Sequence, residues 1–461
     1  MLEMLRRQSQ TRRRAMRSTT SHACGLYPAV GAASMDPRGV IIGREAYSGK
    51  AYIYDPFILY NPSARVRLAS GHALILGKSG YGKSALEKTY VLRQLRFKDR
   101  NFAVLDAQGE DGAGEWDGIA RQLGITPIRL VYGAGDAGEG VRINPLDPRV
   151  PAEHQFKVLV SMMEILTGTI SSQTKFALAE AHKTAIAAAR EQQRVVILSD
   201  VLDALTAPKP TLLGQQPVTP EELVEWGQPA ALALDELCNP SRDLSGMFDG
   251  PTTPGIDLDA RLIIFDLTKL PREGEAMPLL MAVIGPWLRF GWIKTNDRIK
   301  RTLIVEEAWH ILSHRPVARL FEELVRYGRR LGLSFWAVLH HLGDLLLDQA
   351  PEAAAILKLT ATRVLYHMDR DEAETTADYL GLPDWARKAL ADGSNVCAPG
   401  RGIWQVGSRI NLVEHIRTPL EIRLTDTNRR MSETAGPRES ADGRGGQASA
   451  PIIPLRKGAA A

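Results

Sequence analysis

The stretch from residue 73 to residue 95 constrains the fold more than any other part of the sequence. It reads ALILGKSGYGKSALEKTYVLRQL. The first four residues predict a buried strand, the next eight have the pattern G-x-x-x-x-G-K-S, and the remainder has helical character. In this order of strand, glycine-rich loop and helix, backbone N–H groups converge on phosphate oxygens at the positive end of the helix. The stretch therefore predicts a phosphate-binding loop.

The loop pattern assigns roles to individual residues. Lys83 is expected to reach the β- and γ-phosphates of a bound ATP, and the Ser84 hydroxyl is expected to ligate Mg²⁺. A glycine-rich turn without a ligand is the alternative, and the strand and helix on either side disfavour it. The residues expected to surround the phosphates are Gly77, Lys78, Ser79, Gly80, Tyr81, Gly82, Lys83, Ser84 and Ala85.

Further apolar stretches also end in polar residues. Residues 102–105, 262–265, 302–305 and those leading to Leu339 each read as a buried strand, and residues 364–366 are the centre of a fifth. Helical stretches separate them, which is typical of a parallel sheet, whose ligands gather at the carboxyl ends of the strands. The polar residues at these ends are Asp106, Gln108, Glu110, Asp266, Glu306, Glu307, His340 and His341. The pattern favours a single ATP site at one edge of a sheet.

Glu306 and Glu307 stand directly after one of these strands, in TLIVEEAWHIL. Acidic residues also favour the first turn of a helix, so a simple helix start is the alternative explanation. With a phosphate loop present, we expect Glu306 to hold the Mg²⁺ shell and Glu307 to polarise the attacking water as general base. His340 is expected to contact the γ-phosphate or that water, with an ordinary polar cap of the strand as the alternative.

A basic cluster precedes the strand that ends at Leu339. Arg326, Arg329 and Arg330 lie in ELVRYGRRLGLSF. Phosphoryl transfer needs extra positive charge in its transition state, so Arg329 or Arg330 is a candidate finger on the γ-phosphate of a neighbouring subunit. A solvated helix face and a nucleic-acid contact explain the cluster as well. Arg363 is a further candidate finger.

Composition limits the other classes of function. The 461 residues are 44% hydrophobic and 24% charged, which allows two or three domains with buried cores. The net charge of +4 does not by itself indicate a nucleic-acid-binding protein. The three cysteines are far apart, which argues against a disulfide framework or a zinc cluster and fits a reducing, cytosolic setting. The longest apolar candidate, MPLLMAVIGPWL, is too short to span a membrane.

We expect five segments along the chain. They are a disordered basic arm (1–37), the first part of an ATPase domain with the phosphate loop (38–150), an all-helical insertion (151–255), the second part of the ATPase domain (256–428) and a disordered tail (429–461). The arm is compatible with contact to nucleic acid, contact to an anionic membrane surface, or plain solvation. Residues 39–72 predict a small antiparallel lead-in, and residues 400–416 predict a late hairpin.

Eight segments occur in an order that carries a family resemblance. They are GHALILGKSGYGKS, VLDAQGE, RINPLD, MFDGPT, LIIFDLTKL, IVEEAW, PGRGIWQVGSRINLVEH and TPLEIRLTDT. Together they resemble the ATPase domain of conjugative and type IV secretion ATPases, the TraC-like, VirB-four type, within the HerA and FtsK superfamily. The resemblance covers residues 39–427. It implies an α/β fold, a RecA-like P-loop NTPase with a mainly parallel sheet, an all-helical insertion and disordered termini.

Three features depart from the family pattern. Glu306 stands where the family usually has Asp, and Leu339 and His340 stand where it usually has Thr-Gln. A histidine can replace the hydrogen bonds of glutamine, but they then depend on its protonation. We expect no counterpart of the long amino-terminal domain that is common in the family. This leaves open whether that domain is a separate polypeptide or whether the motor is a shortened one, closer to the DNA-translocating relatives.

The resemblance implies an ATP-hydrolysing motor that uses ATP and Mg²⁺ and powers pilus assembly or the transfer of DNA or protein. It implies a ring, a hexamer when active, in the cytoplasm at the inner face of the cell membrane. The implied partners are other copies of the chain, inner-membrane secretion or conjugation components, and DNA as a further candidate. No integral membrane segment is expected. Two alternatives stay open: a DNA-translocating ATPase of the HerA, FtsK or coupling-protein kind, and an ATP-binding assembly scaffold with weak hydrolysis.

Overall fold

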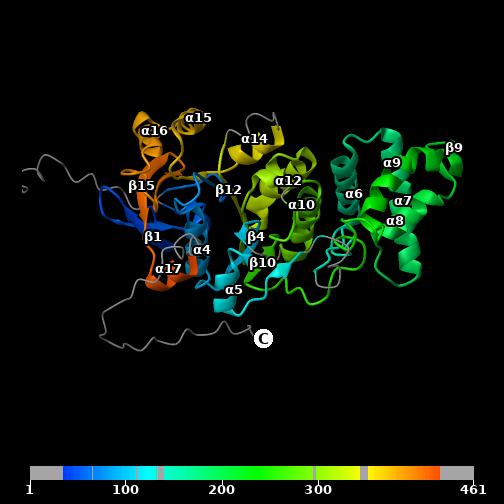
Figure 1. Ribbon diagram of the computed structural model, residues 1–461, viewed down its shortest axis with the longest axis horizontal. Helices are drawn as coiled ribbons and strands as arrows, with labels where there is room; N and C mark the ends of the chain where they lie inside the picture. The colour runs from blue at the N-terminus through cyan, green and yellow to red at the C-terminus, as the bar shows by residue number, and fades with distance from the viewer. Residues whose placement is uncertain are drawn as a thin grey trace, which may run out of the picture.

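The computed structural model describes residues 35–64, 66–110, 113–130, 132, 140–271, 273–293, 297–342 and 351–425. The predicted disordered arm (1–37) and tail (429–461) lie outside the described residues, apart from residues 35–37. The described residues form an elongated molecule in which a helical lobe extends from one end of a part that contains a large sheet (Figure 1). In this part of the chain, no helix combines the length and the apolar character needed to cross a membrane.

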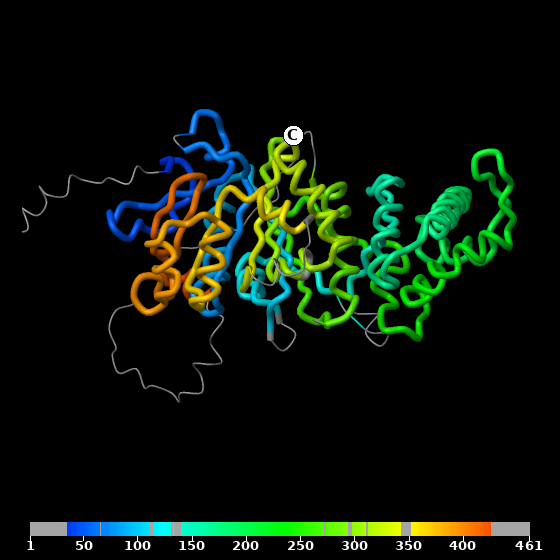
Figure 2. Tube along the Cα trace, turned by 90° about the horizontal axis from the view of Figure 1, so that it is seen from above, coloured from blue at the N-terminus to red at the C-terminus, as the bar shows by residue number. Residues whose placement is uncertain are grey.

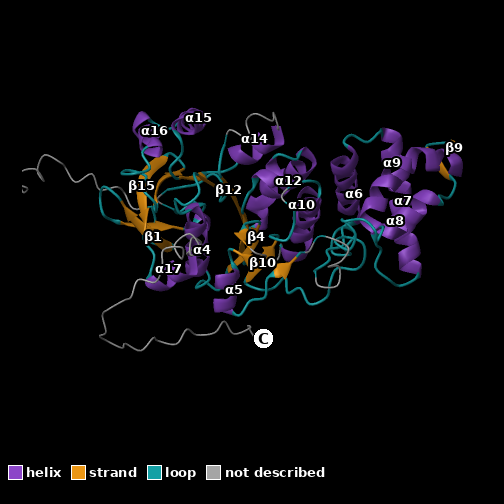
Figure 3. Cartoon of the chain, in the orientation of Figure 1, coloured by secondary structure: helices purple, strands orange, loops and turns teal. Residues whose placement is uncertain are grey.

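The main sheet joins eleven strands of the described residues in the order β2-β1-β15-β14-β13-β3-β12-β11-β4-β10-β7. The strands from β13 to β7 pair in parallel, whereas β14, β15, β1 and β2 extend the sheet with antiparallel pairings. Figure 3 shows these strands gathered away from the helical lobe. The strands are β1 (Val40–Glu45), β2 (Ala51–Tyr54), β3 (Ala73–Leu76), β4 (Arg100–Asp106), β7 (Ile128–Arg129), β10 (Leu262–Asp266), β11 (Lys300–Val305), β12 (Leu333–Leu339), β13 (Thr362–Leu365), β14 (Arg401–Val406) and β15 (Arg409–His415).

The central strands are buried along their whole length because helices cover both faces of the sheet. All residues of β3, β4, β10 and β12 are buried, and such strands read as continuous apolar runs in the sequence. Alternate residues of β3 face opposite sides: Ala73 and Ile75 belong to one hydrophobic cluster, and Leu74 and Leu76 to another. The predicted mainly parallel sheet is confirmed, as are the antiparallel lead-in and the late hairpin.

Each face of the sheet has its own set of helices. The cluster around Ile75 includes residues of α4 and α5, and α17 contacts both of these helices. The cluster around Leu76 includes residues of α10, α12, α14, α15 and α16. The bounds are α3 (Pro56–Leu59), α4 (Lys83–Gln94), α5 (Asp117–Leu123), α10 (Ala276–Trp287) with the π-helical turn η2 (Leu288–Trp292), α11 (Trp309–Leu312), α12 (Arg315–Leu331), α14 (Pro351–Lys358), α15 (Arg370–Leu380), α16 (Asp384–Ala391) and α17 (Pro419–Thr425).

The helical lobe consists mainly of four helices between β7 and β10, at the end of the molecule farthest from β1 and β15 (Figure 2). They are α6 (Ala152–Thr167), α7 (Ser172–Glu191), α8 (Leu198–Thr206) and α9 (Pro220–Cys238). The prediction that this insertion is all-helical is wrong in one detail, because strands β8 (Thr211–Leu213) and β9 (Gln216–Val218) form a hairpin between α8 and α9. A glycine with positive φ, Gly214, lies in its turn, a position that favours a tight hairpin over a helix.

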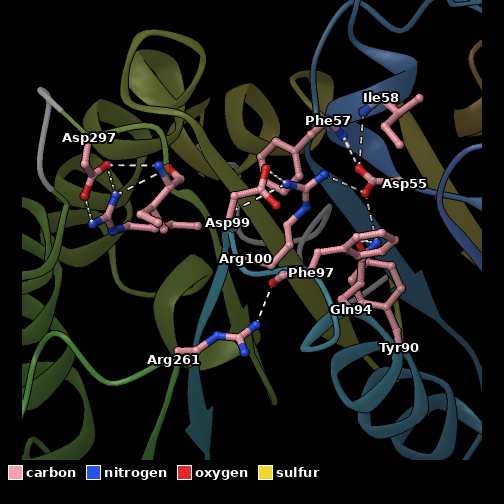
Figure 4. A network of polar contacts seen from close by, with 12 residues as sticks. Asp55, Phe57, Ile58, Tyr90, Gln94, Phe97, Asp99, Arg100, Arg261 and Asp297 are labelled. Carbon is pink, nitrogen blue, oxygen red and sulfur yellow. Dashed lines mark hydrogen bonds and ion pairs between the residues drawn. The ribbon is translucent and has the colours of Figure 1, made fainter. Parts of the chain in front are cut away.

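A buried carboxylate ties the lead-in segment to the edge of the sheet opposite the phosphate loop. The Oδ1 atom of Asp55 accepts from the first backbone N–H groups of α3, at 2.8 and 3.2 Å. Its Oδ2 atom accepts from Gln94, at the end of α4, and from Arg100, at the start of β4, at 3.1 and 2.9 Å (Figure 4). Because Asp55 is fully buried, its charge is compensated by these donors and not by water.

His72, just before β3, joins the same edge of the sheet to α12. Its ring is buried, with Nδ1 accepting from the Phe335 backbone N–H at 3.0 Å and Nε2 donating to the Val325 carbonyl at 3.0 Å. These partners require the neutral ring with its proton on Nε2. Burial lowers the pKa of His72 to about 4.

This buried histidine makes an acid-dependent contribution to stability. Between pH 6.5 and pH 4 the unfolded chain binds a proton at His72 that the folded chain does not, so the free energy of unfolding falls as the pH falls through this window. We expect His72→Gln to reduce the difference in unfolding free energy between pH 7.5 and pH 5 by about 2 kcal/mol. Urea unfolding followed by tryptophan fluorescence at the two pH values measures it. The exposed His341→Gln is the control, and an unchanged pH difference in His72→Gln would contradict the assignment.

Candidate functional site

The parallel pairing brings the polar strand ends to one edge of the sheet. Strand β3 lies between β13 and β12, and Leu76 pairs with both Leu339 and Leu365 at their ends. On the other side of β12, Val305 pairs with Leu105 of β4, so that the residues following these strands are neighbours. Gln108, Glu306 and His340, three of the side chains predicted at this edge, are therefore brought together beside the start of α4.

The phosphate loop follows β3 and ends at the first residues of α4. Gly77, Gly80 and Gly82 all have positive φ, which side chains other than glycine rarely adopt. A Cβ atom on Gly77 would also lie 2.6 Å from the Cβ of Tyr366. Gly82 caps α4 without a side-chain hydrogen bond, and no acidic residue lies in the first turn. The positive end of α4 thus stays available to an anion.

Neighbouring segments hold the loop from outside. The Lys78 backbone N–H donates to the His367 carbonyl at 2.9 Å, and the Gly400 N–H donates to the Tyr81 carbonyl at 3.0 Å. The Lys78 ammonium group pairs with Asp369 at 2.9 Å. Lys78 therefore points away from the predicted phosphate position and toward the start of α15.

Lys83 points inward, under the loop. Its side chain is buried and its Nζ atom donates to the Gly77 carbonyl at 2.6 Å and to His340 Nδ1 at 3.1 Å. Burial lowers the pKa of Lys83 to about 8, against the attraction of nearby carboxylates. A buried ammonium group with two neutral partners is well placed to exchange them for phosphate oxygens.

His340 connects Lys83 to Glu307. With Nδ1 accepting from Lys83, the ring is neutral and its Nε2–H donates to Glu307 Oε1 at 3.0 Å. Gln108, after β4, also donates to Glu307 Oε1, and Trp309 donates to Oε2 at 2.9 Å. The ring of His340 therefore lies in a hydrogen-bonded chain from the phosphate-loop lysine to the predicted base.

Glu307 has an unusual backbone and a perturbed carboxyl group. Its φ is 51°, in the left-handed region that costs free energy for a residue with a side chain. Burial alone would raise the pKa of Glu307, but the hydrogen bonds that His340, Gln108 and Trp309 donate outweigh it and lower the pKa to about 2. The carboxylate is held ionised by the groups around it.

Glu306 lies deeper than Glu307 and in a different environment. Its side chain is buried, and the Trp116 indole donates to its Oε1 at 2.8 Å. Burial raises the pKa of Glu306 to about 7, against the attraction of the buried Lys88 ammonium group. Burial and the Glu306 charge raise the pKa of Asp106 in turn. Two adjacent glutamates in the sequence thus have opposite electrostatic environments.

The cavity at this edge has a volume of about 290 Å³. Its lining includes residues of the phosphate loop, the strand-end residues Gln108, Glu306 and His340, and other residues that the sequence did not assign to the site. Glu307 is not among the lining residues and is joined to the cavity through His340 and Gln108. The lining residues are Ser79, Gly80, Gly82, Lys83, Ser84, Ala85, Gln108, Glu115, Glu306, Val338, His340, Arg417, Ile422 and Thr425. Arg417, just before α17, donates to Thr425, the last residue of this helix, at 2.9 Å. The segment TPLEIRLTDT, noted for its resemblance, was the available signal, but it gave no indication that this helix reaches the cavity.

The predicted arginine fingers lie elsewhere in this chain. Arg329 and Arg330 are exposed in the last turn of α12, which leads into the start of β12 and hence lies at the sheet edge opposite the phosphate loop. The Arg329 guanidinium group lies 5.4 Å from the Tyr60 ring centre, and Arg326 pairs with Glu322. Arg363 donates to Gln405 on β14. None of these arginines lines the cavity of its own subunit, so a finger role concerns only a neighbouring subunit.

The residues present fit a Mg²⁺ ion held together with a nucleotide. Ser84 and Glu306 both line the cavity, and no N–H or hydroxyl group of the described residues donates to Glu306 Oε2. Among these residues, no group of three or more His, Cys, Asp or Glu side chains could hold a metal ion by itself. This is the expected donor set for Mg²⁺, which usually keeps waters and binds one or two protein oxygens plus phosphate.

Solved structures with the same arrangement of elements exist, although no family model and no curated protein matches the sequence. VirB4 of Thermoanaerobacter pseudethanolicus is 18% identical, with a TM-score of 0.67 over 84% of this chain and 99% of that chain. The plasmid coupling protein TrwB in complex with ADP and Mg²⁺ is 13% identical, with a TM-score of 0.51 over 83% of this chain and 91% of that chain. The chain therefore has the RecA-like P-loop fold, with a mainly parallel sheet, that was predicted from its motifs.

Proposed function

We propose that the chain is an ATP-hydrolysing motor of a conjugative or type IV secretion apparatus, powering pilus assembly or the transfer of DNA or protein. The hydrogen-bonded chain from Lys83 through His340 to Glu307, beneath a glycine-rich loop at a helix N-terminus, carries the ATPase part of the proposal. The sequence resemblance and the likeness to VirB4 support the secretion part.

Each residue of the site has a defined task in this proposal. The loop amides and Lys83 bind the β- and γ-phosphates, and Ser84 and Glu306 hold Mg²⁺. When bound, Mg²⁺ neutralises charge that develops on the phosphates. Glu307 orients the attacking water and accepts its proton.

His340 links the phosphates to the base. A phosphate oxygen that takes over Lys83 removes the donor on His340 Nδ1, and the other nitrogen of the same ring holds Glu307. While His340, Gln108 and Trp309 all donate to Glu307, its pKa of about 2 makes it a poor proton acceptor. We infer that binding of the γ-phosphate weakens the hydrogen bond from His340 to Glu307, which makes Glu307 more basic when ATP is in place.

In this proposal, assembly into a ring brings an arginine of a neighbouring subunit to the γ-phosphate. We propose that Arg329 or Arg330, exposed at the opposite edge of the sheet, reaches the γ-phosphate of a neighbouring subunit in a hexamer. In this proposal the ring works in the cytoplasm at the inner face of the cell membrane, against inner-membrane components of the transfer apparatus, with DNA as a further candidate partner.

The first test separates binding from hydrolysis. We expect Lys83→Ala to abolish both ATP binding and phosphate release, because no other ammonium group of the described residues lines the cavity. Glu307→Gln is expected to retain ATP binding and to lower the hydrolysis rate by about 100-fold or more, since it removes the base and keeps its shape. Phosphate release and equilibrium ATP binding are the two measurements, with the exposed Glu153→Gln as the matched control. Normal turnover in Glu307→Gln would exclude it as the base.

The second test concerns His340. We expect His340→Gln to retain most of the activity, because an amide can accept from Lys83 and donate to Glu307 at the same time. His340→Ala breaks the chain, and the loss of about 1.4 kcal/mol of hydrogen bonding corresponds to a rate about tenfold lower. Turnover numbers at saturating ATP compare the two variants, with His341→Ala as the neighbouring control. Equal losses in His340→Gln and His340→Ala would show that the ring is needed for another reason.

One assay distinguishes the motor from the alternatives. A secretion motor is expected to hydrolyse ATP without requiring DNA. A strong stimulation by DNA that disappears with rising salt would instead favour the DNA-translocating alternative. If ATP drives ring assembly, measured by light scattering, while phosphate release stays negligible, the scaffold alternative holds and the proposed function fails.

A further inference from the structure

Trp116 lies behind the nucleotide cavity and touches the predicted metal-side carboxylate. Its side chain is fully buried and does not line the cavity, yet its indole N–H donates to Glu306 Oε1 at 2.8 Å. Glu306 does line the cavity. The side chain of Trp116 thus reaches the lining of the cavity at Glu306.

Several contacts fix the position of Trp116. Its backbone N–H donates to Asp106 Oδ2 at 3.0 Å, at the end of β4. The ammonium group of Lys88 lies 6.0 Å from the centre of its ring and pairs with Glu115 at 2.6 Å. Lys88 is itself fully buried, whereas Glu115 lines the cavity and keeps 17% of its side chain exposed. The indole is therefore clamped by neighbours from α4 and β4.

The backbone that leads to Trp116 is fitted around Asp106. A Cβ atom on Gly114 would lie 2.3 Å from Asp106 Oδ2, so only glycine lets the chain pass this close. The Glu115 N–H donates to the Gln108 carbonyl at 3.0 Å, which closes the turn between β4 and α5. This close fit aims the indole N–H at Glu306.

The contact leaves one oxygen of Glu306 for a ligand. The indole donates to Oε1 of Glu306. No N–H or hydroxyl group of the described residues donates to Oε2, although Glu306 is only 2% exposed. A glutamate has one more rotatable bond than the aspartate usual at this position in the family it resembles, so its carboxylate needs more to hold it in place.

We propose that Trp116 is a positioning residue for Mg²⁺ binding: its indole N–H fixes one oxygen of Glu306 so that the other faces the metal shell. The inference rests on the proposed ATPase function and deepens it. It explains how a glutamate serves at a position where a shorter acid is usual, because the longer arm reaches back to a donor that an aspartate would not reach. Outer-shell donors of this kind usually change metal affinity about 10- to 100-fold.

The test is the Mg²⁺ dependence of ADP binding, which needs no turnover. Fluorescence anisotropy of methylanthraniloyl-labelled ADP is measured as MgCl₂ is titrated, and separately in EDTA. We expect Trp116→Phe to raise the half-saturating Mg²⁺ concentration about tenfold and to leave ADP binding in EDTA unchanged.

Trp336→Phe is the matched control. Trp336 is also a buried tryptophan of the same hydrophobic cluster, and its indole N–H donates to Ser334 at 2.9 Å, away from the cavity. The Trp336→Phe variant therefore loses the same ring atoms and one hydrogen bond, but its substitution does not affect Glu306. An equal rise in both variants would show a general effect of core packing and would overturn the proposal, as would no rise in a folded Trp116→Phe.

A second variant keeps the proposal testable if Trp116→Phe does not fold. Glu306→Asp leaves the core around Trp116 intact but withdraws the carboxylate from the indole. We expect it to raise the half-saturating Mg²⁺ concentration even though it installs the usual family residue. In the double variant the two rises should combine to less than their product, because both remove the same contact. Tighter Mg²⁺ binding in Glu306→Asp would overturn the proposal.

Mg²⁺ titration of the wild-type protein distinguishes a failure of the proposed ATPase function from a failure of the role of Trp116. If Mg²⁺ does not strengthen ADP binding to the wild type, the proposed ATPase function fails, and this inference fails with it. If Mg²⁺ strengthens binding equally in the wild type and in Trp116→Phe, only the role of Trp116 fails.

Discussion

The parallel pairing of β13, β3, β12, β11 and β4 is the constraint on which the site depends. It sends these strands in one direction, so residues far apart in the sequence meet where the strands end. This pairing alone makes neighbours of the loop after β3, the glutamates after β11 and the histidine after β12. Long helices on both faces keep the strands buried and the register fixed.

Burial decides how the charges at this edge behave. Glu87, Asp106 and Glu306 all have raised pKa values, chiefly because they are buried, while Glu307 at the same edge is held ionised by its hydrogen bonds. Of these three, Glu306 lines the cavity, so a cation that enters meets a carboxyl group whose ionised form burial disfavours. Part of the binding free energy of the cation is then used to ionise Glu306, whereas Glu307 is already ionised.

The residues of the candidate site that lie within a local sequence motif could be predicted from the sequence. Lys83 and Ser84 followed from the loop pattern and Glu307 from its place after an apolar strand, and the structure puts Lys83 and Glu307 at the two ends of one hydrogen-bonded chain. Trp116 and Arg417 could not be found in this way, because a buried indole and an arginine after a hairpin have no local signature. The β8–β9 hairpin was hidden by the helical periodicity on either side of it.

The antiparallel extension of the sheet has a consequence for the order in which the protein can form. Strand β1, near residue 40, pairs with β15, near residue 415, and Arg93 of α4 is bonded to Glu421 of α17 at 2.8 Å. The N–H of Gly400, just before β14, donates a hydrogen bond to the carbonyl of Tyr81, a residue of the phosphate loop. The loop is thus supported by segments that a ribosome makes more than 300 residues after it. The contacts that support the loop are complete only when the chain has been synthesised past β15 and α17, so the loop cannot take its final conformation before these late segments have folded against it.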